Sequence, residues 1–311
     1  MSKPAAKPKI IAVVGPTASG KTALAIRLAK ELHGEIISAD SRQIYRGMNI
    51  GTAKPVRDSG HKYFFSEGVR HHLLDIRNPD DPYTVAEFQR DASAAIRDIL
   101  RRKKLPVLAG GTGLYIQAVT ENLELPDVPP DEILRKKLNA RMAREGLDAL
   151  FSELVRLDPE AEYVVDSRNP RRVIRALEVA LSTGRPFTSQ RQKRPVPFSV
   201  LKLGLQPPKE VLFRRIAGRT RKMIADDLFR ETEKLLKKYD FVPALEAIGY
   251  RETAACLRGE ISPAQAEGLM NKNTRAYAKR QITWFKRDAE IKWVRNAGQA
   301  LRLARAFLKS E

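Results

Sequence analysis

Short apolar runs alternate along the chain with stretches whose apolar residues recur at helical spacing. Five of these runs have the length and character of buried strands. They are residues 10–14, 35–39, 105–109, 200–205 and 291–294. Because helical patterns separate the runs, we expect a largely parallel sheet in an α/β core.

The strand pattern is interrupted between residues 126 and 197. This segment is bounded by proline-rich stretches and shows no strand-like run; three or four helices are expected inside it. The predicted organisation is therefore a core formed by residues 1–126 and 198–311, with an all-helical insertion at 127–197.

One helix of the insertion is clearly marked by its ends. Asn169 can cap it, Pro170 suits the first helical position, and Gly184 ends it. Val173 and Ile174 belong to its apolar stripe, which we expect to be buried.

A glycine loop joins the first predicted strand to a helical pattern at 23–32. It fits G-x-x-x-x-G-K-[ST] and consists of Gly15, Pro16, Thr17, Ala18, Ser19, Gly20, Lys21 and Thr22. Such a loop turns backbone N–H groups and a helix N-terminus towards phosphate oxygens. Lys21 is expected to neutralise terminal phosphates, and the Thr22 hydroxyl to hold Mg²⁺. The loop alone does not say which phosphate compound it binds.

Two further strand ends are expected at the same crevice, because ligands of open α/β sheets bind at the carboxyl edge. Asp40 follows the run at 35–39, while the run at 105–109 continues into Gly110, Gly111 and Thr112. This last run carries no carboxylate, although one strand of P-loop kinases and ATPases usually holds the metal with an aspartate. That argues weakly against ordinary nucleotide hydrolysis, since Asp40 could take the role.

The charge of the chain favours an anionic polymer as partner. Lys and Arg number 57 against 37 Asp and Glu, a net charge of +20. Residues 168–194 hold eight basic residues and one acid, Glu178; residues 271–287 hold six basic residues and no acid. Such clusters are typical of nucleic-acid binding. Generic surface charge is the alternative, and charge does not choose RNA over DNA.

Seven stretches, in order along nearly the whole chain, resemble the tRNA dimethylallyltransferases. These tRNA isopentenyltransferases modify the adenine next to the anticodon. The matching stretches are VGPTASGKT at 14–22, ISADSRQIYRGMNIGTAKP at 37–55, HHLLDI at 71–76, AGGTGLY at 109–115, NPRRVIRALEV at 169–179, IGYRE at 248–252 and KRQITWFKRD at 279–288. The resemblance implies a P-loop NTPase-like core with an inserted all-helical tRNA-binding domain.

The resemblance also implies a reaction. A dimethylallyl group passes from dimethylallyl diphosphate to the exocyclic N6 amine of the adenine 3′ of the tRNA anticodon, and diphosphate leaves. Asp40 matches the proposed base, and Thr112 the position near diphosphate and adenine. Lys21, Mg²⁺ and Arg219 would stabilise the leaving group, with Arg215 as the alternative to Arg219.

The anticodon stem-loop of tRNA is the expected partner, with the target adenine flipped out of its stack. The residues expected to contact it are Asp40, Ser41, Arg42, Gln43, Thr112, Arg135, Arg171, Arg172, Val173, Ile174, Arg175, Gly249, Tyr250 and Arg251.

Three further features carry expectations. Aromatic residues of a predicted helix at 271–288, Tyr277 among them, are favoured as core rather than as a stacking platform. Residues 58–69 are longer than the usual link and predict a surface loop or small hairpin. Residues 226–229, Asp-Asp-Leu-Phe, stand where relatives usually have a Gly-Phe pair.

Three rival classes remain open at this point. They are a kinase that uses the loop for ATP, an enzyme that prenylates free adenosine nucleotides, and an RNA-binding protein with a vestigial loop. The lone Cys256 excludes an internal disulfide, and no apolar run reaches membrane-spanning length. A cytoplasmic monomer without a membrane partner is expected.

Overall fold

The computed structural model describes residues 7–124, 128–190 and 195–310. Contacts within the chain divide it into two compact units. We call residues 1–120 with 196–311 the core unit, and residues 121–195 the helical unit. The predicted boundary between residues 126 and 127 lies outside the described residues.

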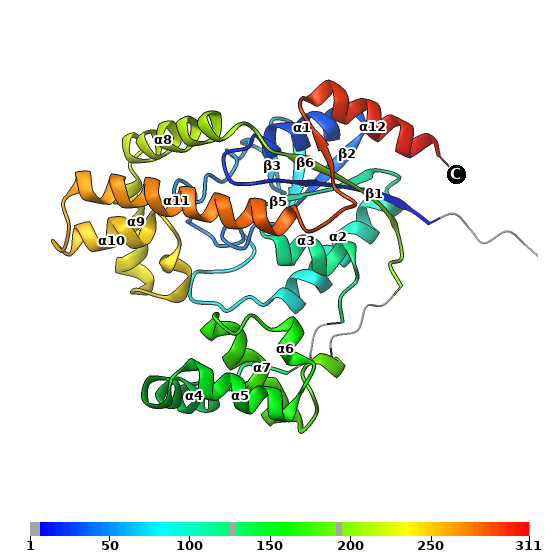
Figure 1. Cartoon of the computed structure of the whole chain (residues 1–311). Coiled ribbons are helices and arrows are strands. Elements are labelled where there is room, and N and C mark those ends of the chain that lie inside the picture. The colour runs from blue at the N-terminus through cyan, green and yellow to red at the C-terminus, as the bar shows by residue number, and fades with distance from the viewer. Residues whose placement is uncertain (1–6, 125–127, 191–194, 311) are drawn as a thin grey trace, which may run out of the picture. The chain divides into compact units, whose positions relative to one another are not determined.

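The core unit contains a seven-stranded sheet in the order β3-β4-β2-β5-β1-β6-β7. Figure 1 shows strands of this sheet with helices of the core unit around them. Its strands are β1 (Lys9–Val14), β2 (Gly34–Ser38), β3 (Phe65–Ser66), β4 (Val69–His72), β5 (Leu105–Gly110), β6 (Ser199–Leu205) and β7 (Lys292–Val294). Every pairing is parallel except that of β3 with β4. The prediction of an α/β fold with a largely parallel sheet is confirmed, and the five predicted strands agree within one residue at each end.

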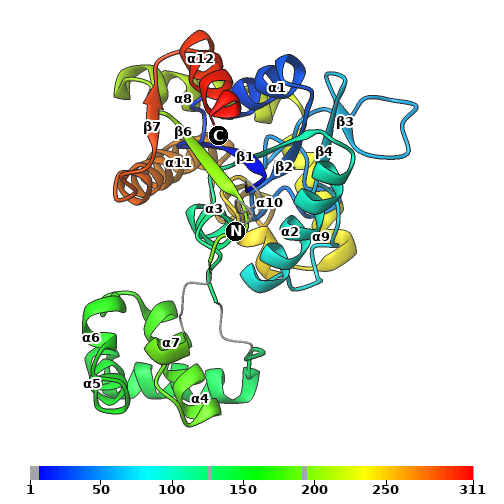
Figure 2. The same cartoon turned by 90° about the vertical axis from the view of Figure 1, so that its right-hand side faces the viewer.

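Helices cover both faces of this sheet. The helices of this unit are α1 (Lys21–Glu31), α2 (Val85–Arg101), α3 (Gly113–Thr120), α8 (Lys209–Ala225), α9 (Leu228–Tyr239), α10 (Tyr250–Leu257), α11 (Pro263–Phe285) and α12 (Ala297–Lys309), with a short 3₁₀ helix, η2 (Pro243–Glu246). Figure 2 shows α1 and α12 on one side of the sheet and α2 and α3 on the other.

The five residues of β1 after Lys9 are all apolar, and their burial explains why. Ile11 and Val13 pack into the cluster formed with α1 and α12, while Ile10, Ala12 and Val14 pack into the cluster formed with α2 and α3. All five are fully buried. A central parallel strand covered on both faces is hydrophobic at every position, so β1 lies at the centre of the core.

A third apolar cluster fixes the segment that follows β2. Ile44 and Met48 from this segment pack with Leu235 of α9, Leu245 of η2 and Tyr250 of α10. Each of these side chains is at most 6 % exposed. The residues after Asp40 are therefore held against α9 and α10.

The helical unit has its own core. Its helices are α4 (Glu132–Glu145), α5 (Leu147–Leu157), α6 (Ala161–Val164) and α7 (Pro170–Thr183), followed by the 3₁₀ helix η1 (Thr188–Gln190). No strand occurs among the described residues of this unit. The predicted ends of α7 are confirmed, since the Asn169 side chain accepts a hydrogen bond from Arg172 N and Gly184 adopts a left-handed conformation, with φ of 65°.

Helix α11 is longer than predicted. The expected helix began near residue 271, whereas α11 begins at Pro263. Ser262 and Gln265 form a reciprocal capping box, and Pro263 occupies the first turn. Phe285 is 2 % exposed and lies in the core, as favoured from the sequence.

The segment at 58–69 contains the start of a β hairpin. Strands β3 and β4 pair antiparallel, and the Asp58 carboxylate accepts hydrogen bonds from the N–H groups of Glu67 and Gly68 at 3.1 and 2.8 Å. The loop before β3 extends away from the sheet (Figure 2). The hairpin alternative is therefore the observed one.

Candidate active site

The glycine loop spans the step from β1 to α1. Gly15 has φ of 148°, and a Cβ there would come within 2.4 Å of the Leu205 carbonyl oxygen. Gly20 caps α1 in a left-handed conformation, with φ of 96°. Both positions require glycine, and between them Ser19 N donates to Pro16 O at 3.2 Å. The loop is thus held wrapped around the N-terminus of α1.

Gln281 of α11 connects two loops of the site. Its Oε1 accepts from Thr17 N at 2.8 Å, and its Nε2 donates to Gly111 O at 2.8 Å. The side chain is 6 % exposed, and a Cβ at Gly111 would lie only 2.3 Å from Nε2. Sequence reasoning missed Gln281. Its position one turn from Tyr277 and one turn from Phe285, on the same helical face, is the signal that could have found it.

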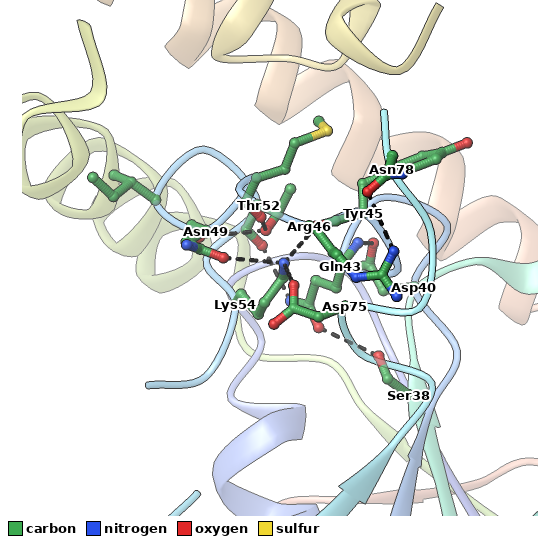
Figure 3. Close-up of polar contacts among 12 residues, drawn as sticks. Ser38, Asp40, Gln43, Tyr45, Arg46, Asn49, Thr52, Lys54, Asp75 and Asn78 are labelled. Atoms are coloured by element: carbon green, nitrogen blue, oxygen red, sulfur yellow. Dashed lines mark hydrogen bonds and ion pairs between the residues drawn. The ribbon is translucent and has the colours of Figure 1, made fainter. Parts of the chain in front are cut away.

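Asp40 lies at the carboxyl end of β2 and is half-buried. Its Oδ1 accepts from Arg42 N at 2.9 Å and from Gln43 N at 3.3 Å, so one oxygen stabilises the turn. Within the described residues, Oδ2 has no hydrogen-bond partner. Figure 3 shows Asp40 beside Gln43, whose amide donates to the carbonyl oxygens of Thr52 and Ala53. The carboxylate is therefore fixed by one oxygen and available through the other.

Thr112 joins the end of β5 to the turn after β2. Its hydroxyl accepts from Ser41 N at 3.1 Å, and its N–H donates to Ala39 O at 3.3 Å. The Thr112 side chain also hydrogen-bonds Tyr277. Burial and the nearby Asp40 charge raise the pKa of Tyr277 to about 12. The Tyr277 hydroxyl is therefore neutral, and it lies at the candidate site. The sequence predicted Tyr277 only as a core residue.

Two cations lie in electrostatic range of Asp40. Burial lowers the pKa of Lys21 to about 8; the Asp40 charge opposes this shift, and the Arg219 charge adds to it. Burial also lowers the pKa of Arg219, again opposed by Asp40. The structure therefore brings together three predicted site residues from α1, the end of β2 and α8.

Arg215, the alternative diphosphate ligand, borders the loop in a different way. Its Nη1 donates to Ser19 O at 3.1 Å, and its side chain is exposed. Arg215 and Arg219 lie one turn apart on α8. Arg215 thus contacts the backbone of the loop, while Arg219 lies in electrostatic range of Lys21 and Asp40.

The loop offers groups that suit a diphosphate and Mg²⁺. The Ser19 hydroxyl is buried and has no hydrogen-bond partner among the described residues. Thr22 is exposed at the start of α1. Mg²⁺ commonly keeps several waters and takes few protein ligands beside substrate phosphates, so one hydroxyl fits it. In the described parts of the chain, no group of three His, Cys, Asp or Glu side chains could hold a metal.

A buried lysine organises the segment after Asp40 (Figure 3). Lys54 Nζ donates to Tyr45 O at 2.6 Å, to Asn49 Oδ1 at 3.1 Å and to Asp75 Oδ1 at 2.5 Å. Its side chain is 2 % exposed. Burial lowers the pKa of Lys54, and the hydrogen bond to Asp75 opposes that shift. Through these three acceptors, Lys54 links separate parts of the chain and fixes the conformation of this segment.

The predicted RNA contacts of the core unit differ in exposure. Ser41, Arg42 and Gln43 are half-buried, and the Arg42 guanidinium donates to Pro243 O at 3.3 Å. Arg251 is exposed and pairs with Glu252 at 2.9 Å.

Gly249 and Tyr250 are buried, and Tyr250 donates its hydroxyl to Glu231 at 2.7 Å. The predicted RNA contact of Tyr250 therefore cannot be made by its ring in this structure, because the ring packs in the third apolar cluster.

The predicted RNA contacts of the helical unit also differ in exposure. Val173 and Ile174 are buried in the core of the unit, so their side chains pack rather than face RNA. Arg171 and Arg172 are exposed at the start of α7. Arg175 is half-buried and belongs to an ion-pair cluster.

That cluster is centred on Glu178, which is fully buried. Its carboxylate accepts from Arg175 Nη1 at 2.7 Å, from Arg135 Nη2 at 3.1 Å and from Asp131 N at 2.8 Å. Burial would raise the pKa of Glu178, but these hydrogen bonds lower it. The only acid of the basic stretch 168–194 thus holds α4 and α7 together, and two predicted RNA ligands share this structural role.

None of the helices in the described part of the chain has the length and apolar character needed to cross a lipid bilayer.

The fold and the site define an α/β protein whose candidate catalytic groups meet at the carboxyl ends of β1, β2 and β5. The chain belongs to the IPP transferase family, whose model matches residues 43–288. The model described as isopentenyl transferase also matches, at residues 8–63.

Similar proteins share one name. The tRNA dimethylallyltransferase of Geobacillus thermodenitrificans is 46 % identical over 92 % of this chain and 90 % of its own length. That of Thermomicrobium roseum is 44 % identical over 91 % and 85 %.

Solved structures are also similar. The tRNA isopentenylpyrophosphate transferase of Bacillus halodurans has a TM-score of 0.70 and 38 % identity, with 97 % of this chain and 96 % of that chain covered. A eukaryotic dimethylallyltransferase acting on tRNA has a TM-score of 0.74 and 26 % identity, with 98 % and 81 % covered.

Proposed function

We propose that this protein transfers a dimethylallyl group from dimethylallyl diphosphate to the exocyclic N6 amine of the adenine 3′ of a tRNA anticodon. Diphosphate is the second product. The family and the relatives named tRNA dimethylallyltransferase support this function. The observation that carries it is the meeting of Asp40, Lys21 and Arg219 beside the glycine loop.

Asp40 acts as the base in this proposal. The exocyclic amine of adenine is a poor nucleophile because its lone pair is delocalised into the ring. As the C–N bond forms, the amine becomes acidic, and a carboxylate within hydrogen-bond reach can accept its proton. Oδ2 of Asp40 is the candidate acceptor, since Oδ1 is engaged by the backbone of the turn. Thr112 and Tyr277 supply hydroxyls beside it that can orient the base.

The loop of residues 15–22 holds the diphosphate. Breaking the allylic C–O bond leaves negative charge on the diphosphate, and preorganised cations stabilise that charge as it develops. Lys21, Arg219 and the N-terminus of α1 are such groups. Mg²⁺, held by Thr22 and by phosphate oxygens, would supply further positive charge there. The core unit serves as a P-loop NTPase-like catalytic domain in this proposal.

The inserted helices bind tRNA in this proposal. The exposed Arg171 and Arg172 support it, as does the excess of basic residues at 168–194. Arginines on phosphates would position the RNA, while base contacts supply the specificity. The arginine-rich helical insertion favours this function over a kinase, which would not need it.

The test is an incubation with Mg²⁺, radiolabelled dimethylallyl diphosphate and unmodified tRNA whose target adenine has adenine neighbours. ATP and free AMP run in parallel. Label in tRNA is the expected result. Label in AMP alone would assign the protein to enzymes that prenylate free nucleotides. Consumption of ATP without transfer would show that the loop holds a nucleotide, and the proposal would be wrong.

A further inference from the structure

A basic cavity lies in the core unit outside the site described above. Its volume is about 470 Å³, and it opens between the turn after β2 and helix α9. The turn contributes Arg46 and Asn49, and α9 contributes Arg230, Lys234 and Lys238. None of the predicted catalytic, diphosphate-binding or tRNA-binding residues lines it.

The positive charge of this cavity is not balanced by its two acids. Glu231 is already hydrogen-bonded within the core unit. Its carboxylate accepts hydrogen bonds from the backbone N–H groups of Asn49, Ile50 and Gly51 at 2.9 to 3.2 Å and from the hydroxyl of Tyr250 at 2.7 Å. Asp227 lies 3.9 Å from Arg230, an exposed pair that contributes little. The cavity therefore keeps an excess of positive charge.

Two lysines of the cavity have no acidic partner. Lys234 and Lys238 are exposed, and neither forms an ion pair within the described residues. Lys237, their neighbour on α9, pairs with Glu233 at 2.6 Å, and Lys222 on α8 pairs with Asp226 at 2.9 Å. The unpaired lysines are thus the ones that line the cavity, and the paired ones lie outside it.

The cations form a row rather than a single point of charge. Arg230, Lys234 and Lys238 follow one another at intervals of four residues on α9, which places successive positions about 6 Å apart along the helix axis. Arg46 borders the same cavity and donates to Asn78 Oδ1 at 3.2 Å, so it is held in place (Figure 3). A row of cations suits a chain of phosphates better than one small anion.

The turn that lines the cavity belongs to the same segment of the chain as Asp40, the segment after β2. Glu231 joins the turn at 49–51 to Tyr250, and Gln43 donates to Thr52 O just beyond that turn. We propose that this cavity binds the phosphate backbone of the RNA substrate, next to the residues that carry the chemistry. This inference rests on the proposed function and adds a binding surface to it.

The test compares two double variants. Lys234→Gln with Lys238→Gln removes the unpaired charges, and Lys237→Gln with Lys222→Gln removes the same number of paired charges nearby. Glutamine keeps helix propensity close to that of lysine, so both variants should fold. Binding of unmodified tRNA is measured over a range of salt concentrations. We expect the first variant to lose on the order of tenfold in affinity at low salt and to flatten the salt slope by about 1.5. The control should keep the slope, and Lys234→Arg with Lys238→Arg should retain affinity.

Equal slopes for the two double variants would overturn the inference. A calorimetric titration with inorganic pyrophosphate provides a second check. If Lys234→Gln with Lys238→Gln removes a pyrophosphate site but leaves the RNA slope unchanged, the cavity binds a small anion and the inference is wrong. The transfer assay separates this result from a failure of the proposed function. If the wild-type protein labels no tRNA, that function fails; if it does label tRNA, the slopes judge the cavity alone.

Discussion

The two oxygens of Asp40 have separate tasks. Oδ1 holds the turn through Arg42 N and Gln43 N, and Oδ2 is the proton acceptor in the proposed reaction. Asp40→Asn tests this division, because the amide oxygen can still accept both N–H groups while the basicity is lost. We expect kcat to fall by about 10²- to 10⁴-fold, the usual contribution of a general base. The dissociation constant of dimethylallyl diphosphate, measured by calorimetry, should change little.

Asp58→Asn is the matched control. Asp58 also accepts two backbone N–H groups, those of Glu67 and Gly68, but it lies in the hairpin before β4. Its variant should retain the wild-type kcat. A near-normal kcat for Asp40→Asn would remove Asp40 as the base and leave it only its role in the turn.

The lowered pKa of Lys21 predicts a pH dependence of diphosphate capture. The ammonium is charged below its pKa of about 8 and becomes neutral above it. Because the charged form binds the diphosphate, kcat/KM for dimethylallyl diphosphate should fall as the pH rises through this value. This parameter reports groups of the free enzyme. Lys21→Arg, whose guanidinium stays charged, should lack the falling limb even if its rate is lower. A limb that persists in Lys21→Arg would belong to another group.

At this scale the sequence predicted candidate residues at the strand ends and missed residues of α11 that hydrogen-bond to the same loops. Lys21, Asp40 and Thr112 follow from motifs at strand ends, because the carboxyl edge of a parallel sheet gathers its loops. Gln281 and Tyr277 lie far along the chain, and only the tertiary packing of α11 brings them to the loops. A helical pattern predicts that such residues face inward, but not which loop they meet.

Strands were the elements most accessible to prediction. Strands β1 and β5 are buried along almost their whole length, and β1 packs against helices on both faces, so their composition is mostly apolar. The hairpin of β3 and β4 lies at the sheet edge and is short, and its polar residues carry little strand signal. Helix α11 begins after the cap formed by Ser262 and Gln265. Only a search of the sequence for capping boxes would have predicted this start.

Asp227 adopts a backbone conformation that favours glycine. It precedes α9 with φ of 71°, in the left-handed region where a Cβ is disfavoured. Asp227→Gly should raise the free energy of unfolding by about 0.5–1 kcal/mol, because glycine adopts this conformation without strain. Asp226 has φ of −83°, so Asp226→Gly should be neutral or destabilising. Urea unfolding of both variants provides the measurement, and equal shifts would contradict the account.

Arg175 is predicted to stabilise the fold of the helical unit, independently of any contact with RNA. It donates to the fully buried Glu178 and to Val128 O at 2.8 Å. Arg175→Ala leaves Glu178 with fewer donors, and a loss of about 1–3 kcal/mol in stability is expected. Thermal unfolding followed by circular dichroism measures it, with Arg185→Ala, the loss of an exposed arginine in the same unit, as control. Any weakening of tRNA binding by Arg175→Ala is then read only after this loss is known.

At the scale of the whole molecule, each of the two units has the means to fold on its own. The core unit has two large apolar clusters on its sheet and a third beside α9 and α10, and the helical unit has one formed by α4, α5 and α7. The candidate catalytic groups come from the core unit alone. The candidate catalytic groups and a large share of the predicted RNA contacts therefore lie in separate units of the chain.

The ends of the helical unit make this separation testable. Asn122 Nδ2 donates to Pro195 O at 3.0 Å, so the chain enters and leaves the unit at neighbouring points. Replacing residues 123–194 by a short Gly-Ser linker should leave the core folded, because the linker has little distance to span. We expect pyrophosphate with Mg²⁺ to bind with an unchanged dissociation constant by calorimetry. Affinity for tRNA should fall, with a flatter salt slope, since the arginines of α7 are gone.

Each measurement in this deletion judges a different part of the interpretation. Loss of pyrophosphate binding from a core that still unfolds cooperatively would mean that the phosphate site depends on the inserted helices, against the assignment of residues 15–22. An unchanged salt slope for tRNA would place the phosphate contacts on the core unit and leave Arg175 of α7 with only its role beside Glu178. A flatter slope with pyrophosphate binding retained is what the structure leads us to expect, because the loop, Asp40 and Arg219 lie in the core unit while the most basic stretch, 168–194, lies in the helical unit.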